Sequence, residues 1–586
     1  MFSYIFLVLS IIPILSREKI LEVKNNIYCL ILTSLIFSYT TLGLISLVLT
    51  FLSQSKFPII YITITLFLII SLKDKDFLFK YKIIKKFLLS EINNFTFNFK
   101  KKNNIFLFLI FVLFLLITIS AIGPINHPDA LDYHVGYPYQ YWINNKFIID
   151  GGIHQGLLGI GDYANIAFIQ EKSIWLIRYI QIIILPIILI FLLSRKINKL
   201  SLLVFLSSPV FLQWSTIGKP LFLGESSCAI SYLLWLENKD PRLRSFLVIC
   251  IISCLSIKIS SLIVCFPIVI HIAYDLIKNY KLSFNLSLIN ELKNTLYAKE
   301  IVISIITLIS ILFSRQIIIN NFAFPLLTGF FNKDNILITK FANEITNYQR
   351  DGLFPLNIFF PVKVSDLSSA LGPAILIIIL LSIYSSFKNL RSKNNVICNV
   401  AIFQTILLIL FCQGRGDYYC FPLILFTFFS ENLNMIKRNK YINFLFSISV
   451  NLQLLLIICF LSISINQNIQ SVLNLNKALR NHSYGYAPSN FINKNTKGNI
   501  FYNVTRAPRL YFPKNYISRE KLDICLISNN YDQSTCIDNF NITQIVSHPD
   551  YLQNRDGFNC QRRESVKGSR NIFNRGKILL EICEKI

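Results

Sequence analysis

Long apolar runs constrain this chain more than any other feature of its sequence. Residues 105–122 and 174–193 are each predominantly apolar and long enough to cross about 30 Å of hydrocarbon as a helix. Of the 586 residues, 53% are hydrophobic and only 15% are charged, whereas about a quarter of an average soluble domain is charged. We therefore expect an all-α polytopic membrane protein rather than an ordinary soluble enzyme.

Hydropathy predicts about 14 transmembrane helices, several of them shorter than an ideal span of about 20 residues. The expected spans are residues 2–15, 27–52, 57–72, 105–123, 173–194, 199–215, 219–236, 245–257, 261–276, 300–316, 372–388, 395–412, 419–433 and 441–464.

Short basic loops predict how these helices are oriented. The formal net charge is +26, from 57 basic and 31 acidic residues, and the segment 73–104 contains many of the lysines. Because short cytoplasmic loops carry an excess of lysine and arginine, this segment is expected in the cytoplasm. Alternation of the helices then places 123–172, 317–371 and everything after 465 on the outer side. We expect a bacterial inner-membrane protein with a periplasmic C-terminal domain.

Three domains follow from this pattern. Residues 1–104 are expected to hold extra N-terminal transmembrane helices and the basic loop, 105–465 a transmembrane core, and 466–586 a small soluble α/β domain. Strands are expected at 499–504, 524–528, 542–546 and 577–582. Four cysteines of this domain permit two disulfides in an oxidising compartment, with three connectivities open. They are Cys525, Cys536, Cys560 and Cys583.

The first outer loop concentrates the residue types that carry chemistry. It contains His127, His134 and His154, which are three of the six histidines in the chain, and also Asp129 and Asp132. On a helical turn the two aspartates share a face, where they can supply a general base or bind a divalent cation such as Mg²⁺ or Mn²⁺. The alternative is that Asp129 only caps an interfacial helix whose tyrosines and Trp142 form an aromatic belt.

The order of several motifs resembles the GT-C glycosyltransferases, a multi-helix family that uses sugars linked to polyprenyl phosphate. The acidic loop reads Asp-x-x-x-Tyr-His-x-x-x-Pro from Asp129 to Pro138, and the resemblance extends along residues 105–430. Further matching steps are Ser208-Pro209, Gly218-Lys219-Pro220, Lys258, Arg315 with Asn320 and Pro325, and Gly414 to Tyr419 with Pro422. Three helices precede the family's usual first helix.

The resemblance implies roles for these residues. Asp129 would be the base, and Asp132 an alternative base or a metal ligand. Since the leaving group is a lipid phosphate, cations at outer helix ends would stabilise it. The expected substrate-binding residues are His127, Tyr133, His134, Lys219, Lys258, Arg315 and Arg415.

The sequence leaves open the role of the basic residues and the identity of a second acidic residue. The basic residues have an alternative role, in which they simply extend to the membrane interface. The family's second acidic residue is absent at Leu221, and Glu225 stands four positions on.

The expected function is hexosyl or pentosyl transfer from a polyprenyl-phosphate donor to a lipid, glycan or protein of the cell envelope. Membrane lipids are expected partners and nucleic acid is not. One alternative is a flippase for lipid-linked oligosaccharides or another transporter, since the helix count suits transporters, although no internal repeat is found. Another is an O-antigen ligase or polymerase, a class that does not predict an acidic motif directly after an early helix.

Overall fold

A computed structural model describes most of the chain. The described segments are 24–59, 105–149, 152–195, 197–238, 241–280, 298–332, 335–347, 353–360, 364–388, 393–412, 414–428, 439–503, 509–511, 516–518, 532–547, 557–567 and 577–586, with short pieces between them. The expected span 2–15 and almost all of the basic segment 73–104 lie outside these residues.

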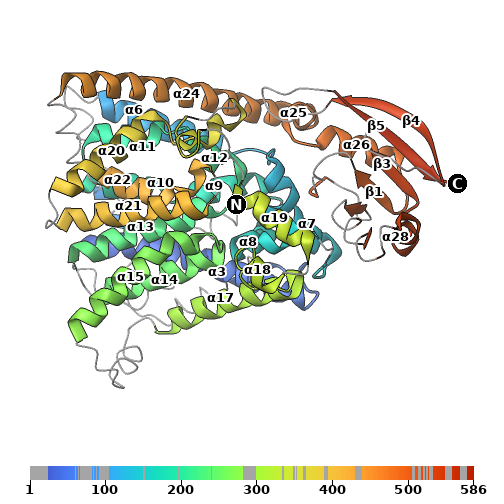
Figure 1. Cartoon of the computed structure of the whole chain (residues 1–586), viewed down its shortest axis with the longest axis horizontal. Coiled ribbons are helices and arrows are strands. Elements are labelled where there is room, and N and C mark those ends of the chain that lie inside the picture. The colour runs from blue at the N-terminus through green and yellow to red at the C-terminus, as the bar shows by residue number, and fades with distance from the viewer. Residues whose placement is uncertain are drawn as a thin grey trace.

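The described part of residues 24–473 is helical, and its helices pack side by side in one bundle (Figure 1). The main helices are α3 (Lys24–Phe51), α6 (Ile105–Ser120), α9 (Ile177–Ile182), α10 (Leu185–Ser194), α11 (Lys199–Ser207), α12 (Val210–Ile217), α13 (Leu221–Asn238), α14 (Pro241–Ile257), α15 (Ser261–Tyr280), α17 (Ala298–Ile319), α20 (Pro373–Lys388), α21 (Lys393–Phe411), α22 (Cys420–Phe428) and α24 (Lys440–Leu473).

The bundle is that of a multi-pass membrane protein, and the described residues contain fewer full-length spans than the 14 expected for the whole chain. Within the described residues five helices are long and apolar enough to cross a membrane, or six if a bent pair is one span. That pair is α11 and α12, which meet at 58° where the chain passes through Ser208 and Pro209. Hydropathy alone counts this apolar run as one span, whereas the break divides it into two short helices.

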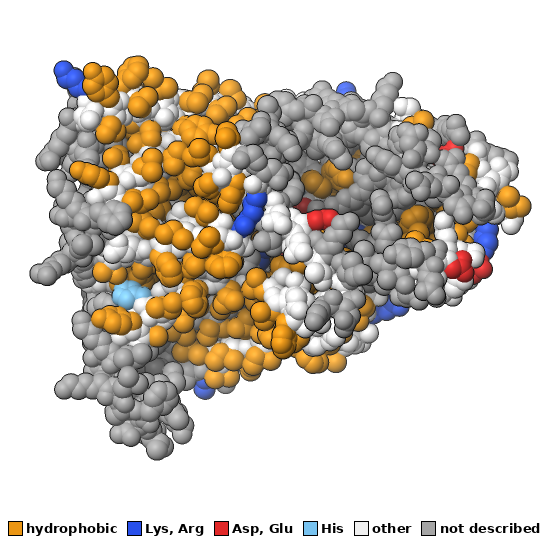
Figure 2. Space-filling view, in the orientation of Figure 1, with side chains coloured by type: hydrophobic (Ala, Val, Ile, Leu, Met, Phe, Trp, Pro, Cys, Tyr) orange, Lys and Arg blue, Asp and Glu red, His pale blue; other side chains and the backbone are white. Residues whose placement is uncertain are grey.

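Lipid contact explains the surface of the bundle. Figure 2 shows hydrophobic side chains spread over the helical half of the molecule. Exposed examples include Phe108 on α6, Phe313 on α17 and Leu455 on α24. A soluble protein rarely exposes so large a continuous apolar surface, whereas a bilayer covers it.

The first described helix, α3, is part of the core of the bundle. It packs against α8 (Ile160–Gln170), α13, α14 and α17. The Tyr39 hydroxyl on α3 donates a hydrogen bond to the Gly161 carbonyl at the start of α8, at 2.8 Å. This helix, expected to be an addition in front of the core, therefore helps to position the first outer loop.

The two long connections at one end of the bundle are folded. Residues 123–172 form the π-helical turn η1 (Ala130–His134), α7 (Gly136–Asn144), the 3-10 turn η2 (Ile153–Leu157) and α8. Residues 317–371 form α18 (Thr328–Phe331), α19 (Ile336–Asn347) and the 3-10 turns η4 (Leu356–Ile358) and η5 (Val364–Ser369). In Figure 1, α7, α18 and α19 lie at the end of the bundle that faces the C-terminal sheet.

The C-terminal domain is a small mixed α/β unit. Its sheet has the order β2-β1-β3-β5-β4, in which β1 runs parallel to β2 and β3, and β5 runs antiparallel to β3 and β4. The elements are α25 (Leu475–His482), α26 (Tyr486–Asn495), β1 (Ile500–Asn503), β2 (Tyr516–Ser518), α28 (Gln533–Asn539), β3 (Gln544–Ser547), β4 (Phe558–Lys567) and β5 (Lys577–Lys585).

The expected strand at 524–528 is wrong, because Cys525 and Leu526 are helical. Cys525 instead bonds to Cys536, and Cys560 bonds to Cys583 across the β4–β5 pair. The two expected disulfides are therefore formed, and they are consistent with an extracytoplasmic face.

Helix α24 joins the two parts. Its 34 residues span about 51 Å at 1.5 Å per residue, well beyond the hydrocarbon thickness of about 30 Å. Asn468 near its end donates hydrogen bonds to the carbonyls of Ile119 and Ser120 at the end of α6. The helix thus leaves the bundle at the same end as α6 and leads into α25 (Figure 1).

Removing the β4–β5 disulfide tests the role of this cross-link. Cys560→Ala with Cys583→Ala should lower the stability of the sheet by about 3 kcal/mol, because the bond closes a loop with a sequence separation of 23. Hydrogen exchange of β4 and β5 in the full-length chain measures the change. Cys459→Ala, at an exposed free cysteine, is the control. Unchanged exchange in the double variant would contradict the prediction.

Candidate functional site

The acidic loop is folded inward instead of lying along the membrane surface. Asp132 and His134 are buried in η1, and Asp129 is half-buried at its start. Tyr137 and Tyr141 on α7 are fully buried, so they pack in the core and do not form the aromatic belt of the alternative interpretation. A π-helical turn is rare in proteins and is frequent at functional sites.

His134 pairs with a carboxylate of the next helix. Its Nδ1 lies 2.7 Å from Oδ1 of Asp162, whose Oδ2 accepts the backbone N–H of Gly159 at 2.8 Å. Burial lowers the pKa of His134 and outweighs Asp162, which raises it. The neutral imidazole leaves Nε2 buried, without a hydrogen-bond partner among the described residues.

Asp132 is held by the C-terminal domain. Nη1 of Arg509, in the connection between β1 and β2, forms an ion pair with Oδ1 of Asp132. His154 Nδ1 lies 3.7 Å from Oδ2. The Arg509 guanidinium also lies 4.2 Å from the ring centroid of Tyr137. Since Arg509 and Asp132 are both buried, this contact fixes the soluble domain on the outer loop.

Backbone hydrogen bonds extend the same contact. The Leu510 N–H donates to the Leu131 carbonyl at 3.2 Å, and Gln140 Nε2 donates to the Arg509 carbonyl at 2.9 Å. Tyr484 N–H donates to the Asn126 carbonyl at 3.2 Å. The C-terminal domain is therefore bound along the length of the acidic loop.

Close packing at the start of α8 brings three outer turns together. A Cβ at Gly159 would lie 1.6 Å from the Ile257 carbonyl oxygen, and a Cβ at Gly161 would lie 2.8 Å from Pro220. Only glycine permits this approach of backbones. This close packing places Asp162 beside the turns that carry Lys219 and Lys258.

Three of the predicted cations gather around Asp417 and Tyr418. Lys219 Nζ lies 2.8 Å from Asp417 Oδ2, and Arg415 Nε lies 3.1 Å from Oδ1. The Lys219 and Lys258 ammonium groups lie 4.3 and 5.3 Å from the centroid of the Tyr418 ring. We call Lys219, Lys258, Arg415, Asp417 and Tyr418 the outer cation cluster.

The electrostatics of this cluster favour a further anion. Burial raises the pKa of Asp417, but Arg415 and Lys219 outweigh it and hold that pKa at about 2. Burial lowers the pKa of Lys219, yet Asp417 raises it overall. Burial and the neighbouring Lys219 lower the pKa of Lys258. Lys258 forms no ion pair with any described residue, so an added phosphate would stabilise its charged form.

Arg315 stands apart from this cluster. Its Nη2 donates to the Leu158 carbonyl at 2.9 Å, and its electrostatic neighbours are Asp162 and Tyr163. Nε and Nη1 are buried without a partner among the described residues. The four predicted cations therefore divide into a cluster of three and one arginine on the other side of Asp162.

His127 makes a local contact. Its Nδ1 accepts the backbone N–H of Asp129 at 3.2 Å, which stabilises the turn before η1. Tyr133 stacks with His154 at 5.7 Å between ring centroids, and it interacts electrostatically with Lys219. These contacts bring the acidic loop to the edge of the outer cation cluster.

Asp417 and Arg509 are not predicted from the sequence as functional residues, whereas Asp162, an aspartate of the first outer loop, is predicted only as a second choice. Asp417 lies two residues after Arg415 in the motif Gly414 to Tyr419, and this spacing lets the two side chains form an ion pair. Asp162 follows Gly159 by three residues, as a capping carboxylate does. Arg509 has no local signal, since its partner is 377 residues away in the sequence.

Comparison with known proteins adds no relative. No protein-family model matches the chain, and no curated protein matches it. The resemblance to GT-C glycosyltransferases therefore stays a prediction that rests on the motifs and their positions.

The buried His134 predicts a pH dependence of stability. Its pKa is lower in the folded chain than the ordinary value of 6.5, so below about pH 6.5 the unfolded chain binds a proton that the folded chain does not. The free energy of unfolding should fall with decreasing pH, by at most about 1.4 kcal/mol per pH unit from this group. Thermal unfolding of wild type and His134→Gln should be compared between about pH 5 and pH 8, the range in which histidine titrates. His482→Gln is the control. Equal pH slopes in wild type and His134→Gln would refute it.

The buried ion pair predicts that Arg509 docks the C-terminal domain. Arg509→Ala leaves Asp132 buried without its partner and should destabilise the docked state by about 3–5 kcal/mol. Limited proteolysis between α24 and β1 should become faster, whereas Arg480→Ala on the exposed face of α25 should not change it. The double variant Arg509→Gln, Asp132→Asn should recover much of the loss. If Arg509→Ala were cleaved at the same rate as wild type, the docking role of Arg509 would be wrong.

Proposed function

We propose that this protein is a membrane glycosyltransferase that moves a sugar from a polyprenyl-phosphate donor to a lipid, glycan or protein of the cell envelope. The proposal includes about 14 spans of a GT-C-like core, a bacterial inner-membrane location and a periplasmic C-terminal domain. The observation that carries it is the outer cation cluster, in which Lys258 lies beside Lys219 without an anionic partner among the described residues.

The position of this cluster suits a lipid phosphate. Lys219 lies between α12 and α13, Lys258 between α14 and α15, and Arg415 between α21 and α22. All three turns are at helix ends on the side of the bundle that carries the folded loops. A phosphate on a lipid lies at this depth, and lysine and arginine bind its oxygens through charge-assisted hydrogen bonds.

The acidic loop supplies the base in this proposal. Asp129 is half-buried and lies close enough to His134 to interact with it electrostatically. Asp132 is already engaged by Arg509 and His154. In the proposal Asp129, the base that the GT-C resemblance implies, takes the proton of the acceptor hydroxyl, and Asp132 positions the loop through its contacts with Arg509 and His154. If a divalent cation takes part, Asp129 and Asp132 are the carboxylates that would bind it.

One observation favours a transporter as the alternative. The broken helix pair α11 and α12 resembles the discontinuous helices that form binding sites in transporters. However, the buried ion pairs of the site lie at helix ends and in turns, not at the break between Ser208 and Pro209. The assay below separates the two functions, because a transporter moves the lipid without cleaving the sugar from its phosphate.

Sugar transfer by the purified chain tests the proposal. In nanodiscs with a polyprenyl-phosphate sugar and an envelope extract as acceptor, wild type should release polyprenyl phosphate. Asp129→Asn should lower kcat about 10²- to 10⁴-fold, the usual contribution of a general base. Lys258→Met should raise the KM for the donor about 10- to 100-fold, because it removes a charged contact to phosphate.

The controls are chosen from the same outer surface. Lys146→Met, at an exposed lysine of the first outer loop, should keep wild-type kinetics. Transfer that persists in both Asp129→Asn and Asp132→Asn would show that the proposed base is wrong. Transport of the donor without release of polyprenyl phosphate would favour the alternative.

A further inference from the structure

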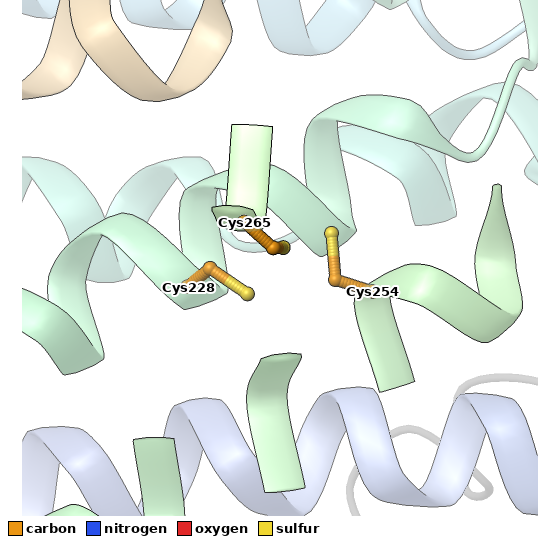
Figure 3. A group of neighbouring side chains, drawn as sticks. All are labelled: Cys228, Cys254 and Cys265. Carbon is orange, nitrogen blue, oxygen red and sulfur yellow. The ribbon is translucent and has the colours of Figure 1, made fainter. Parts of the chain in front are cut away.

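Three buried cysteines meet beneath the outer cation cluster. Cys228 on α13, Cys254 on α14 and Cys265 on α15 are free thiols, and their Sγ atoms all lie within 4.8 Å of one another. Figure 3 shows the three side chains directed toward a common space between the helices. The helices come together closely here, because a Cβ at Gly224 would lie 3.1 Å from the Cys254 Sγ.

We propose that Cys228, Cys254 and Cys265 bind a thiophilic metal ion, either zinc or copper(I). Thiolate is the ligand that selects these two ions. Zinc lies about 2.3 Å from each sulfur, which puts sulfurs of a tetrahedral site about 3.8 Å apart. The present separations of up to 4.8 Å therefore need to shorten by no more than about 1 Å.

Glu225 distinguishes the two ions. It precedes Cys228 by one helical turn on α13 and interacts electrostatically with Cys254 and Cys265. Both carboxylate oxygens are buried and have no hydrogen-bond partner among the described residues. This carboxylate can supply the fourth, oxygen ligand that zinc takes, whereas copper(I) is satisfied by sulfur.

The other group of ligating side chains in the described residues does not compete. It consists of Cys560, Glu581 and Cys583, and its two cysteines form a disulfide. The cluster of three thiols is therefore the site whose sulfurs can bind a metal.

A metal here would fix the geometry above it. Cys228 lies about two turns into α13, Cys254 lies about one turn before the end of α14, and Cys265 lies about one turn into α15. The turns that join or precede these helix ends carry Lys219 and Lys258. One ion bound to all three helices would thus hold both lysines in place, and this role does not depend on the proposed transfer reaction.

Metal analysis of the full-length chain tests the proposal. The protein is produced with added zinc and copper, purified in detergent and analysed for bound metal, and about one ion per chain is expected. The triple variant Cys228→Ser, Cys254→Ser, Cys265→Ser should lose it, and Cys398→Ser, at a buried cysteine of α21, should keep it. Loss of metal in Glu225→Gln indicates zinc, and retention indicates copper(I).

A measurement on wild type covers the case in which the triple variant does not fold. Metal-bound thiols of the folded chain should resist alkylation and become reactive when a strong chelator is added. Two results would overturn the proposal: bound metal in wild type no higher than in the triple variant, or a disulfide between any two of these three cysteines. If the triple variant cannot be purified, alkylation that is independent of chelator overturns it instead.

Discussion

The buried carboxylate of Asp417 is the interaction on which the outer surface of the bundle depends. It forms ion pairs with both Lys219 and Arg415 in a place where either cation alone would be costly to bury. Trp214 on α12 donates a hydrogen bond to the Asp417 carbonyl, which fixes the turn before α22 against a second helix end. Because Lys219 and Arg415 share the single carboxylate of Asp417, the cluster has more basic groups than acidic ones, and Lys258 forms no ion pair with any described residue.

The acidic loop reaches this cluster because of backbone packing. Gly159 and Gly161 let the start of α8 approach Ile257 and Pro220, and Asp162 then lies between the cations and His134. On the other side, Arg509 binds Asp132 and brings the C-terminal domain onto the loop. The transmembrane bundle, the outer loop and the soluble domain thus meet at one set of ionic contacts.

Part of this arrangement could be predicted from the sequence. Apolar runs predict a multi-pass membrane protein, and four cysteines among polar residues predict a disulfide-bonded domain. Hydropathy does not give the number of full-length spans within the described residues, since apolar runs such as that of α6 form helices of fewer than 18 residues. The burial of Asp132 and His134 could not be predicted either, because their partners Arg509 and Asp162 are specified only by the tertiary fold. Of the four predicted cations, Lys219, Lys258 and Arg415 lie together around Asp417 and Tyr418, whereas Arg315 lies apart.

The central claim is that the outer cation cluster binds the phosphate of a lipid. A cryo-EM structure of the full-length chain in nanodiscs with polyprenyl phosphate tests it most directly. We expect phosphate density in contact with the ammonium groups of Lys219 and Lys258, on the side away from Asp417. Phosphate density elsewhere on the protein, with the two lysines still beside Tyr418 and unliganded, would contradict it.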